Sequence, residues 1–360
     1  MMPQLAALEA RVSEVEIVAR AEPRGRAAPV GIIAAGEPFF VHGHASAPGC
    51  GDWGEVDRGA FACLDETTDT TDAPTHLPRG DPNTLPYVYA RLARGLPGPI
   101  YASLADFEAG APPVARFEPN HSYHFLSQQP SARGEVLVAS DGHVVPAAKA
   151  EIYAPSAFAG RDLIADPLAE GVALAWCIEP AGCTASDGAM LAFQAQVALE
   201  PVPPKGRVRR WQPAPRPIGV SDEEIWLDVH LAQQTLAVYR GDAAVFVTLV
   251  SAGVGGEYAT PRGTFRILDK LVENDMISLP GAEDEYHVER VPWVAHFKPR
   301  YALHGAYWHG RFGLPASHGC VNLSPMDAHI VFDLLRPGLP PGWRPAWPTK
   351  DDAGTAIRVR

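Results

Sequence analysis

The 360-residue sequence lacks an apolar run long enough to span a bilayer, so we expect no transmembrane segment in it. It also lacks a surplus of positive charge, because 30 Lys and Arg residues stand against 42 Asp and Glu residues. Nucleic-acid binding depends on basic residues that neutralise phosphates, so no nucleic-acid partner is expected. Residues 1–17 lack the apolar core of a signal peptide, and we expect any export signal to lie outside them.

Cysteine is scarce, with five residues in the whole chain. Cys50 and Cys63 flank a predicted hairpin, and Cys177 and Cys183 enclose a short turn. An odd count of this kind divides naturally into two local disulfides and one free thiol, Cys320, which suits an oxidising compartment. Five reduced cysteines in a cytoplasmic protein remain the alternative.

Proline and glycine, by contrast, are plentiful, with 36 and 33 residues. They favour short strands joined by turns, so we predict a mainly β, multi-domain protein. The expected division is an N-terminal helix or tail (1–15), a small β-barrel (16–80), a second β-rich module of one or two units (81–200), a Pro-rich connector (201–222), a mixed β domain with one helix (223–347) and a C-terminal tail (348–360). The N-terminal helix is suggested by the helical spacing of Leu5, Leu8, Val12 and Val15.

Short apolar runs separated by Gly and Pro define the first module, at 18–23, 30–33, 39–41, 51–56 and 59–62. Their order resembles that of the bacterial Src-homology-3-like domains, in which an arginine-containing first strand, a mid-domain glycine and a Gly-x-Trp pair recur. In the last domain, runs at 225–229, 235–239 and 245–250 predict a β-meander of antiparallel neighbours.

The residues that indicate chemistry lie at 317–322, which read Ser-His-Gly-Cys-Val-Asn, and at the preceding His304-Gly305. A cysteine is a good nucleophile as the thiolate, and a nearby imidazole is the usual means of forming one. His318 would share a face with Cys320 if the chain were extended there, whereas His304 approaches only through folding. The backbone amides of Gly319 and Cys320 are candidates for an oxyanion hole.

A helix is predicted directly after the cysteine. Ser324 is a favourable N-cap, Pro325 suits the first helical position, and Asp327 places an acid in the first turn. The helix should end near Leu335, before a Pro-Gly pair. Cys320 is therefore expected on a short strand or turn that leads into a helix.

These segments closely resemble the active-site motif of the L,D-transpeptidases. Residues 250–253 and 260–265 also resemble that family's Val-Ser-x-Gly and Thr-Pro-x-Gly-x-Phe segments, so the resemblance covers roughly residues 223–347. It implies that Cys320 is the nucleophile, that His304 activates it, and that the carbonyl of Gly305 orients His304. It further implies an oxyanion amide at Gly319 and a pocket shaped by the following residues: Ser317, His318 and Asn322.

Two further aromatic residues, Trp308 and Tyr286, are candidate substrate contacts, although Trp308 could equally serve in packing. No cofactor is implied. The ligand types of His304, His309, His318 and Cys320 would suit zinc, but a His-x-Cys bite is awkward, so no metal is expected here.

The resemblance implies attack on the third residue of a peptidoglycan tetrapeptide stem with release of the terminal D-alanine. The thioester is then transferred to an amine, which gives a 3→3 cross-link. It also implies covalent inhibition by β-lactams of the carbapenem type and a location outside the cytoplasm, in the periplasm or cell wall. The alternatives are an L,D-carboxypeptidase that uses water as acceptor and a catalytically silent wall-binding scaffold.

An acidic segment between the motifs gives one more hypothesis. Six carboxylates at positions 273–289 outnumber the nearby basic residues and would attract a cationic amine acceptor: Glu273, Asp275, Glu283, Asp284, Glu285 and Glu289. A solvated loop without such a role is the alternative.

Overall fold

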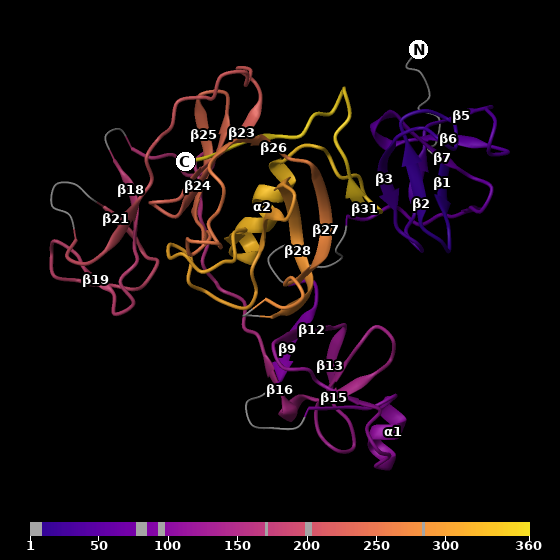
Figure 1. Ribbon diagram of the computed structural model, residues 1–360, viewed down its shortest axis with the longest axis horizontal. Coiled ribbons are helices and arrows are strands. Elements are labelled where there is room, and N and C mark those ends of the chain that lie inside the picture. Colours follow the sequence, from indigo (N-terminus) through magenta and orange to yellow (C-terminus); the bar gives the residue numbers. More distant parts are fainter. Residues whose placement is uncertain (1–8, 77–84, 93–97, 170–171, 199–203, 283–284) are drawn as a thin grey trace.

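The computed structural model describes residues 9–76, 85–92, 98–169, 172–198, 204–282 and 285–360. The described chain is mainly β, with two α-helices. Figure 1 shows a central domain, drawn mostly in orange and yellow, with smaller modules on three of its sides. No helix among the described residues is long and apolar enough to cross a membrane.

The predicted meander is confirmed as β23 (Ile225–His230), β24 (Thr235–Arg240) and β25 (Ala243–Leu249), paired antiparallel. The six-stranded sheet around it has the order β17-β25-β24-β23-β32-β26. Its other members are β17 (Arg161–Asp162), β26 (Gly263–Arg266) and β32 (Ala356–Val359). The segment 348–360 is therefore no simple tail, because β32 pairs with both β23 and β26.

A second sheet carries the cysteine-histidine motifs. Its strands in the central domain are β27 (Asp269–Ile277), β28 (His287–Lys298), β29 (Tyr301–Gly305), β30 (Val321–Leu323) and β31 (Trp343–Ala346). The long antiparallel hairpin of β27 and β28 pairs with β29, and β29 pairs in parallel with β30. Apolar side chains from both sheets meet in one core, which includes Leu227, Val238, Phe297 and Val321.

Helix α2 (Pro325–Leu334) follows β30 as predicted. The Ser324 hydroxyl accepts a hydrogen bond from the backbone N–H of Asp327, which satisfies one of the free amides of the first turn. Val331 and Phe332 are buried in the core between the sheets. Burial of such a side chain contributes about 1.5–3 kcal/mol to the free energy of unfolding. The packing of α2 in the core therefore holds the segment that follows Cys320 in place.

The described residues of the first module form eight strands and one 3₁₀ turn: β1 (Glu9–Val12), β2 (Ile17–Arg20), β3 (Pro29–Ile33), β4 (Phe39–Val41), β5 (Gly43–Ala45), β6 (Trp53–Val56), the turn Asp57–Gly59, β7 (Ala60–Cys63) and β8 (Thr68–Asp69). The expected helix is wrong for residues 9–12, because β1 pairs with β4 and β8 and this pairing overrides the helical spacing.

The expected closed barrel is also wrong for the described residues. Strands β3-β2-β7-β6-β5 form one end of a 13-stranded sheet, while β4-β1-β8 form a separate sheet. The edge strand β3 pairs with β31 of the central domain and does not close on its own module. Main-chain pairing thus attaches the first module to the central domain.

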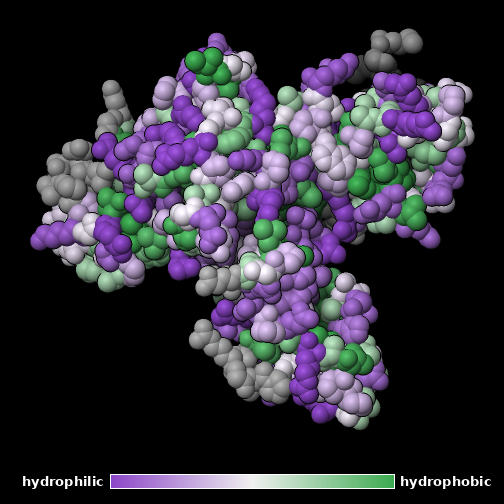
Figure 2. Space-filling view, in the orientation of Figure 1, coloured by the Kyte–Doolittle hydropathy of each residue, from purple (hydrophilic) through white to green (hydrophobic). Residues whose placement is uncertain are grey.

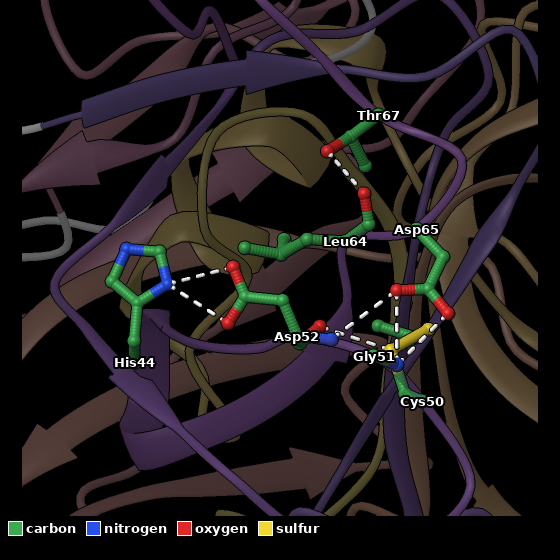
Figure 3. The surroundings of a disulfide bond; sticks show 8 residues. His44, Cys50, Gly51, Asp52, Leu64, Asp65 and Thr67 are labelled. Carbon is green, nitrogen blue, oxygen red and sulfur yellow. Dashed lines mark hydrogen bonds and ion pairs between the residues drawn. A yellow bond between two sulfur atoms is a disulfide. The ribbon is translucent and has the colours of Figure 1, made fainter.

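Both predicted disulfides are present, and Cys320 is free. Figure 3 shows the surroundings of the Cys50–Cys63 bond, where the Asp65 carboxylate accepts hydrogen bonds from the backbone amides of Gly51 and Asp52. This network orders the loop beside the crosslink, so the bond joins two positions that are already held close.

The second module contains a hairpin of β14 and β15, joined by a turn at Asp141-Gly142. Its elements are β9 (Val88–Leu92), β10 (Pro99–Ile100), α1 (Leu104–Ala109), β11 (Ala115–Arg116), β12 (His121–Phe125), β13 (Ser127–Gln129), β14 (Val136–Val138), β15 (Val144–Pro146), the 3₁₀ turn Ala147–Lys149 and β16 (Ala150–Ile152). Helix α1 was not predicted from the sequence, although Ser103 caps its start and the left-handed Gly110 ends it.

A third small unit surrounds the buried Trp176. It contains β18 (Leu174–Cys177), β19 (Cys183–Thr184), β20 (Met190–Leu191), β21 (Gln196–Ala198) and β22 (Val208–Arg210). Strand β22 comes from the predicted connector, whose Arg207 pairs with Glu179. On the face shown in Figure 2, hydrophilic residues predominate and hydrophobic ones form small groups.

Candidate active site

Cys320 lies immediately before β30, at the end of a turn that begins at Ser317. Its side chain is partly exposed, and its Sγ atom lies 3.8 Å from the carbonyl oxygen of Arg300. Burial raises the pKa of the Cys320 thiol above its ordinary value. The resting residue is therefore a neutral thiol, and it needs a base when it reacts.

The parallel pairing of β29 and β30 brings the strand of His304 beside the strand that follows Cys320. His304 stands opposite Asn322 in this pairing, and Cys320 directly precedes β30. Cys320 and His304, which are 16 positions apart in the sequence, therefore lie on adjacent segments of the fold.

The His304 ring is buried and neutral. Burial lowers the pKa of His304 to about 4, although its hydrogen bond to the Gly305 carbonyl acts in the opposite direction. The Nδ1 atom lies 3.1 Å from that oxygen. This contact assigns the proton to Nδ1, which leaves a lone pair on Nε2. At neutral pH the ring can therefore accept a proton from a thiol.

His318 does not share a strand face with Cys320, which corrects the geometric expectation. The backbone turns at Gly319, where φ is +119°, so residues 317–320 are not extended. His318 is exposed. The centroid of its ring lies 4.5 Å from that of Tyr258 and 5.1 Å from that of Tyr286. The structure therefore places this imidazole in an aromatic surface group.

Gly319 has a conformation and surroundings that require glycine. A Cβ atom there would lie 2.8 Å from the ring of Tyr301, in addition to the strain of a positive φ. Its amide, however, donates to the Ser317 hydroxyl at 3.1 Å. That amide must leave Ser317 before it can donate to a substrate oxyanion. The Ser317 hydroxyl also donates to the carbonyl of Cys320, which holds the turn closed.

The upstream motifs pack directly against this turn. Ser251 and Asn322 exchange two backbone hydrogen bonds, of 2.9 and 3.0 Å. The buried Thr260 hydroxyl accepts from the amide of Gly253 at 2.9 Å and donates to the carbonyl of Gly319 at 2.8 Å. The segments that the sequence analysis grouped by resemblance therefore form one hydrogen-bonded unit.

His309 is a residue whose position the sequence analysis left undecided. Its Nε2 lies 3.1 Å from the side-chain amide of the buried Asn322, and its Nδ1 accepts from the amide of Arg311. Burial lowers the pKa of His309 to about 4, so the neutral ring carries its proton on Nε2. The atom of Asn322 that faces it is then the amide oxygen. The available sequence signal was the position of His309 in the loop between His304-Gly305 and residues 317–322.

Two aromatic residues complete the surroundings. The Trp308 ring lies 5.7 Å from that of His304 and packs against two apolar clusters, so it has the packing role that the sequence analysis allowed. Burial raises the pKa of Tyr286, and the nearby Cys320 adds to this effect. Tyr286 and Cys320 pack against the same apolar cluster.

The acidic segment differs from the expected free carboxylates. Glu273 pairs with Arg290 and Arg344, and Glu289 pairs with two histidines of the second module. Asp275 accepts from the backbone amide of Arg290. Glu283 and Asp284 lie outside the described residues. Because at least three of the six acids are engaged within the chain, attraction of a cationic acceptor by this segment is weakened.

Metal-binding side chains do not cluster around Cys320 among the residues that the structure describes. Two groups of three occur elsewhere, and one of them contains the Cys50–Cys63 disulfide. The other consists of His121, His287 and Glu289. The site around Cys320 and His304 thus combines a thiol, a neutral imidazole and polarised backbone groups, which is a set suited to acyl transfer.

Residues 224–342 match the family model of the L,D-transpeptidase catalytic domain. No curated protein matches the chain. Among solved structures, an L,D-transpeptidase from Mycobacterium smegmatis is 25% identical, with 38% of this chain and 58% of that chain covered and a TM-score of 0.31. The chain thus spans less than two thirds of that relative.

Two further solved structures are similar. L,D-transpeptidase 3 from Mycobacterium tuberculosis, in complex with a faropenem-derived adduct, is 22% identical, with 38% of this chain and 60% of that chain covered and a TM-score of 0.31. The catalytic domain of the E. faecium enzyme is 19% identical, with 38% and 98% covered and a TM-score of 0.30.

Proposed function

Since residues 224–342 are an L,D-transpeptidase catalytic domain, we propose that the chain is an active peptidoglycan L,D-transpeptidase with Cys320 as nucleophile. The pairing of β29, which contains His304, with β30, which directly follows Cys320, supports the proposal. A tetrapeptide stem is the acyl donor, and the amine of another stem is the acceptor.

The reaction begins with attack of the Cys320 sulfur on the carbonyl carbon of the third stem residue. The thiol proton passes to Nε2 of His304, whose Nδ1–H continues to donate to the Gly305 carbonyl. Collapse of the tetrahedral intermediate breaks the amide bond, and D-alanine leaves with the proton returned by His304. The acceptor amine then attacks the thioester, which releases the free thiol and forms the 3→3 cross-link.

The neutral His304–Cys320 pair suits this sequence of proton transfers. Burial disfavours charge on both residues, so neither is ionised before the substrate binds. The oxyanion of the intermediate would receive a hydrogen bond from the Gly319 amide once that group leaves the Ser317 hydroxyl. Asn322, oriented by His309, would contact the stem peptide.

We place the enzyme outside the cytoplasm. Two disulfides in one chain are typical of oxidising compartments, and the substrate of the catalytic domain would be cell wall. The N-terminal modules would position the catalytic domain on the wall. The Src-homology-3-like resemblance of the first module remains a prediction.

Covalent labelling by a carbapenem tests the proposed nucleophile. Intact-mass spectrometry of the full chain after incubation with imipenem should show one adduct per molecule. Cys320→Ala should show none, because the four other cysteines are in disulfides. Ser186→Ala is the matched control, as Ser186 is exposed in a turn of the third small unit and the variant keeps the thiol, so labelling should be retained. An adduct that persists in Cys320→Ala would overturn the assignment.

A further inference from the structure

A histidine-carboxylate cluster lies where the second module meets the central domain. Strand β12 of that module pairs in parallel with β28 (Figure 1). In this pairing His121 stands opposite His287. Side chains two residues apart point to the same face of a strand, so Glu289 joins these two histidines. The sheet register therefore gathers three side chains from two distant parts of the sequence.

The three side chains are close enough to share one ion. One potential ligand atom from each of His121, His287 and Glu289 lies within 4.8 Å of the others. The Nε2 atom of His121 lies 2.7 Å from Oε1 of Glu289. In a tetrahedral zinc site with bonds of about 2.0–2.1 Å, neighbouring ligand atoms lie roughly 3.3 Å apart. Side-chain adjustments of about 1 Å would bring the three atoms into this arrangement.

We propose that His121, His287 and Glu289 bind one divalent transition-metal ion, with Zn²⁺ as the best match to two imidazoles and a carboxylate. The ion replaces the proton now shared between His121 and Glu289, and water fills the fourth position. The site is separate from Cys320 and would not take part in acyl transfer.

Each proposed ligand has an outer partner, as metal-binding residues in proteins usually do. His124 holds the second oxygen of Glu289 through a 2.6 Å hydrogen bond. Asp275 lies 3.4 Å from Nε2 of His287, which leaves Nδ1 of that ring as the ligand atom. These partners fix the orientation of a carboxylate and of an imidazole before any ion binds.

His121 carries a second sign of a ligand. Its Nδ1 atom is buried without a hydrogen-bond partner, and the nearest carboxylate oxygen, from Glu118, lies 3.6 Å away. A buried ring nitrogen without a partner costs stability, and such a cost needs an explanation. If Nε2 binds the ion, Nδ1 carries the proton and can donate to Glu118 after a small shift.

The carboxylate of Glu289 is largely buried between the two parts of the chain. Its side chain is 18% exposed, and its two oxygens contact His121 and His124. A buried carboxylate is stabilised by a bound cation.

An ion at this position would fasten the second module to the hairpin beside the active site. His121 belongs to the module, whereas His287 and Glu289 belong to β28. The residue before His287 is Tyr286, whose ring contacts His318. Metal binding would therefore stabilise the position of Tyr286 beside the candidate active site.

Metal titration of the tag-free full chain in a Cys320→Ala background tests the proposal, since that background removes the one free thiol. Zn²⁺ alone, followed by calorimetry, should bind with one equivalent per chain. Co²⁺ should give the visible absorption of a tetrahedral site. His287→Ala and Glu289→Gln should each lower the Zn²⁺ affinity at least 100-fold, and His124→Ala about 10- to 100-fold.

His143→Ala is the matched control, because His143 pairs with Asp141 in a turn of the same module but lies outside the cluster. Its Zn²⁺ affinity should equal that of the background. His287 is one-third exposed, so its replacement should leave the apo protein folded, as circular dichroism can check. Equal Zn²⁺ affinity in His287→Ala and the background, or no saturable binding, would overturn the proposal. The cluster would then serve only to join the second module to β28 through hydrogen bonds.

Discussion

The Nδ1 atom of His304 lies 3.1 Å from the carbonyl oxygen of Gly305, the next residue in the chain. A backbone carbonyl always accepts and never donates, so this contact fixes which nitrogen of the ring keeps its proton. Glycine at 305 also leaves room for the neighbouring core, because a Cβ atom there would lie 3.2 Å from the Trp293 ring. The base and its orienting group are thus set by one dipeptide.

The first prediction concerns the pH dependence of acylation. The pKa of His304 is lowered to about 4 by burial, so its neutral form is lost only as the pH falls through about 4. The rate of acylation by imipenem should be constant from about pH 5.5 to 8 and should fall below about pH 4. Stopped-flow absorbance of the β-lactam measures the acylation rate at each pH. A loss of rate with a midpoint near pH 6.5 would instead indicate a solvent-exposed base.

Replacement of His304 should slow acylation much more than replacement of His318. His304→Gln should lower the acylation rate about 10²–10⁴-fold, the usual contribution of a general base. His318→Gln loses aromatic contacts worth about 0.5–1.5 kcal/mol, so its rate should fall by about tenfold at most. Both rates come from the same imipenem assay. The opposite ranking would make His318 the base in solution.

Replacement of Thr260 tests the hydrogen bonds that support the cysteine turn. Thr260→Val keeps the shape of the side chain but leaves the Gly253 amide and the Gly319 carbonyl without their partner, at a cost of about 1–3 kcal/mol for each buried group. Urea unfolding should show a reduced free energy of unfolding, and acylation should slow.

Thr264→Val is the control for that variant, because Thr264 is exposed on β26. Its free energy of unfolding should change by less than about 0.5 kcal/mol. If Thr260→Val behaves like this control, the two buried hydrogen bonds do not support the turn.

Thiol titration under denaturing, non-reducing conditions tests the disulfide assignment. The intact chain should contain one reactive thiol and Cys320→Ala none, since the other four cysteines are paired. Reduction of the Cys50–Cys63 bond, which spans 13 residues, should lower stability by about 3 kcal/mol on the chain-entropy description. Five reactive thiols in oxidatively prepared protein would contradict the exported location.

Local signals in the sequence were sufficient for the elements around Cys320. The N-cap at Ser324 and the proline at 325 predicted α2. The short apolar runs at 225–250 predicted the meander. Both predictions succeeded because caps and turns depend on neighbouring residues. The same local reasoning failed at His318, since it assumed an extended chain where Gly319 turns it. A glycine inside a strand pattern was the signal for that turn.

Long-range pairing was beyond the sequence patterns. Nothing near residues 356–359 indicates a strand between β23 and β26, and nothing near His121 indicates β28 as its neighbour. The same holds for β3, whose pairing with β31 replaces barrel closure. Such contacts depend on which edges meet after folding, and a single sequence does not specify them locally.

Muropeptide analysis tests the proposed activity most directly. Purified full-length protein is incubated with disaccharide tetrapeptides, and the products are separated and identified by mass spectrometry, with Cys320→Ala as control. We expect 3→3 cross-linked dimers and free D-alanine with the wild-type chain and unchanged substrate with Cys320→Ala. Tripeptides without dimers would instead indicate a carboxypeptidase, and unchanged tetrapeptides with the wild-type chain would contradict catalysis by Cys320.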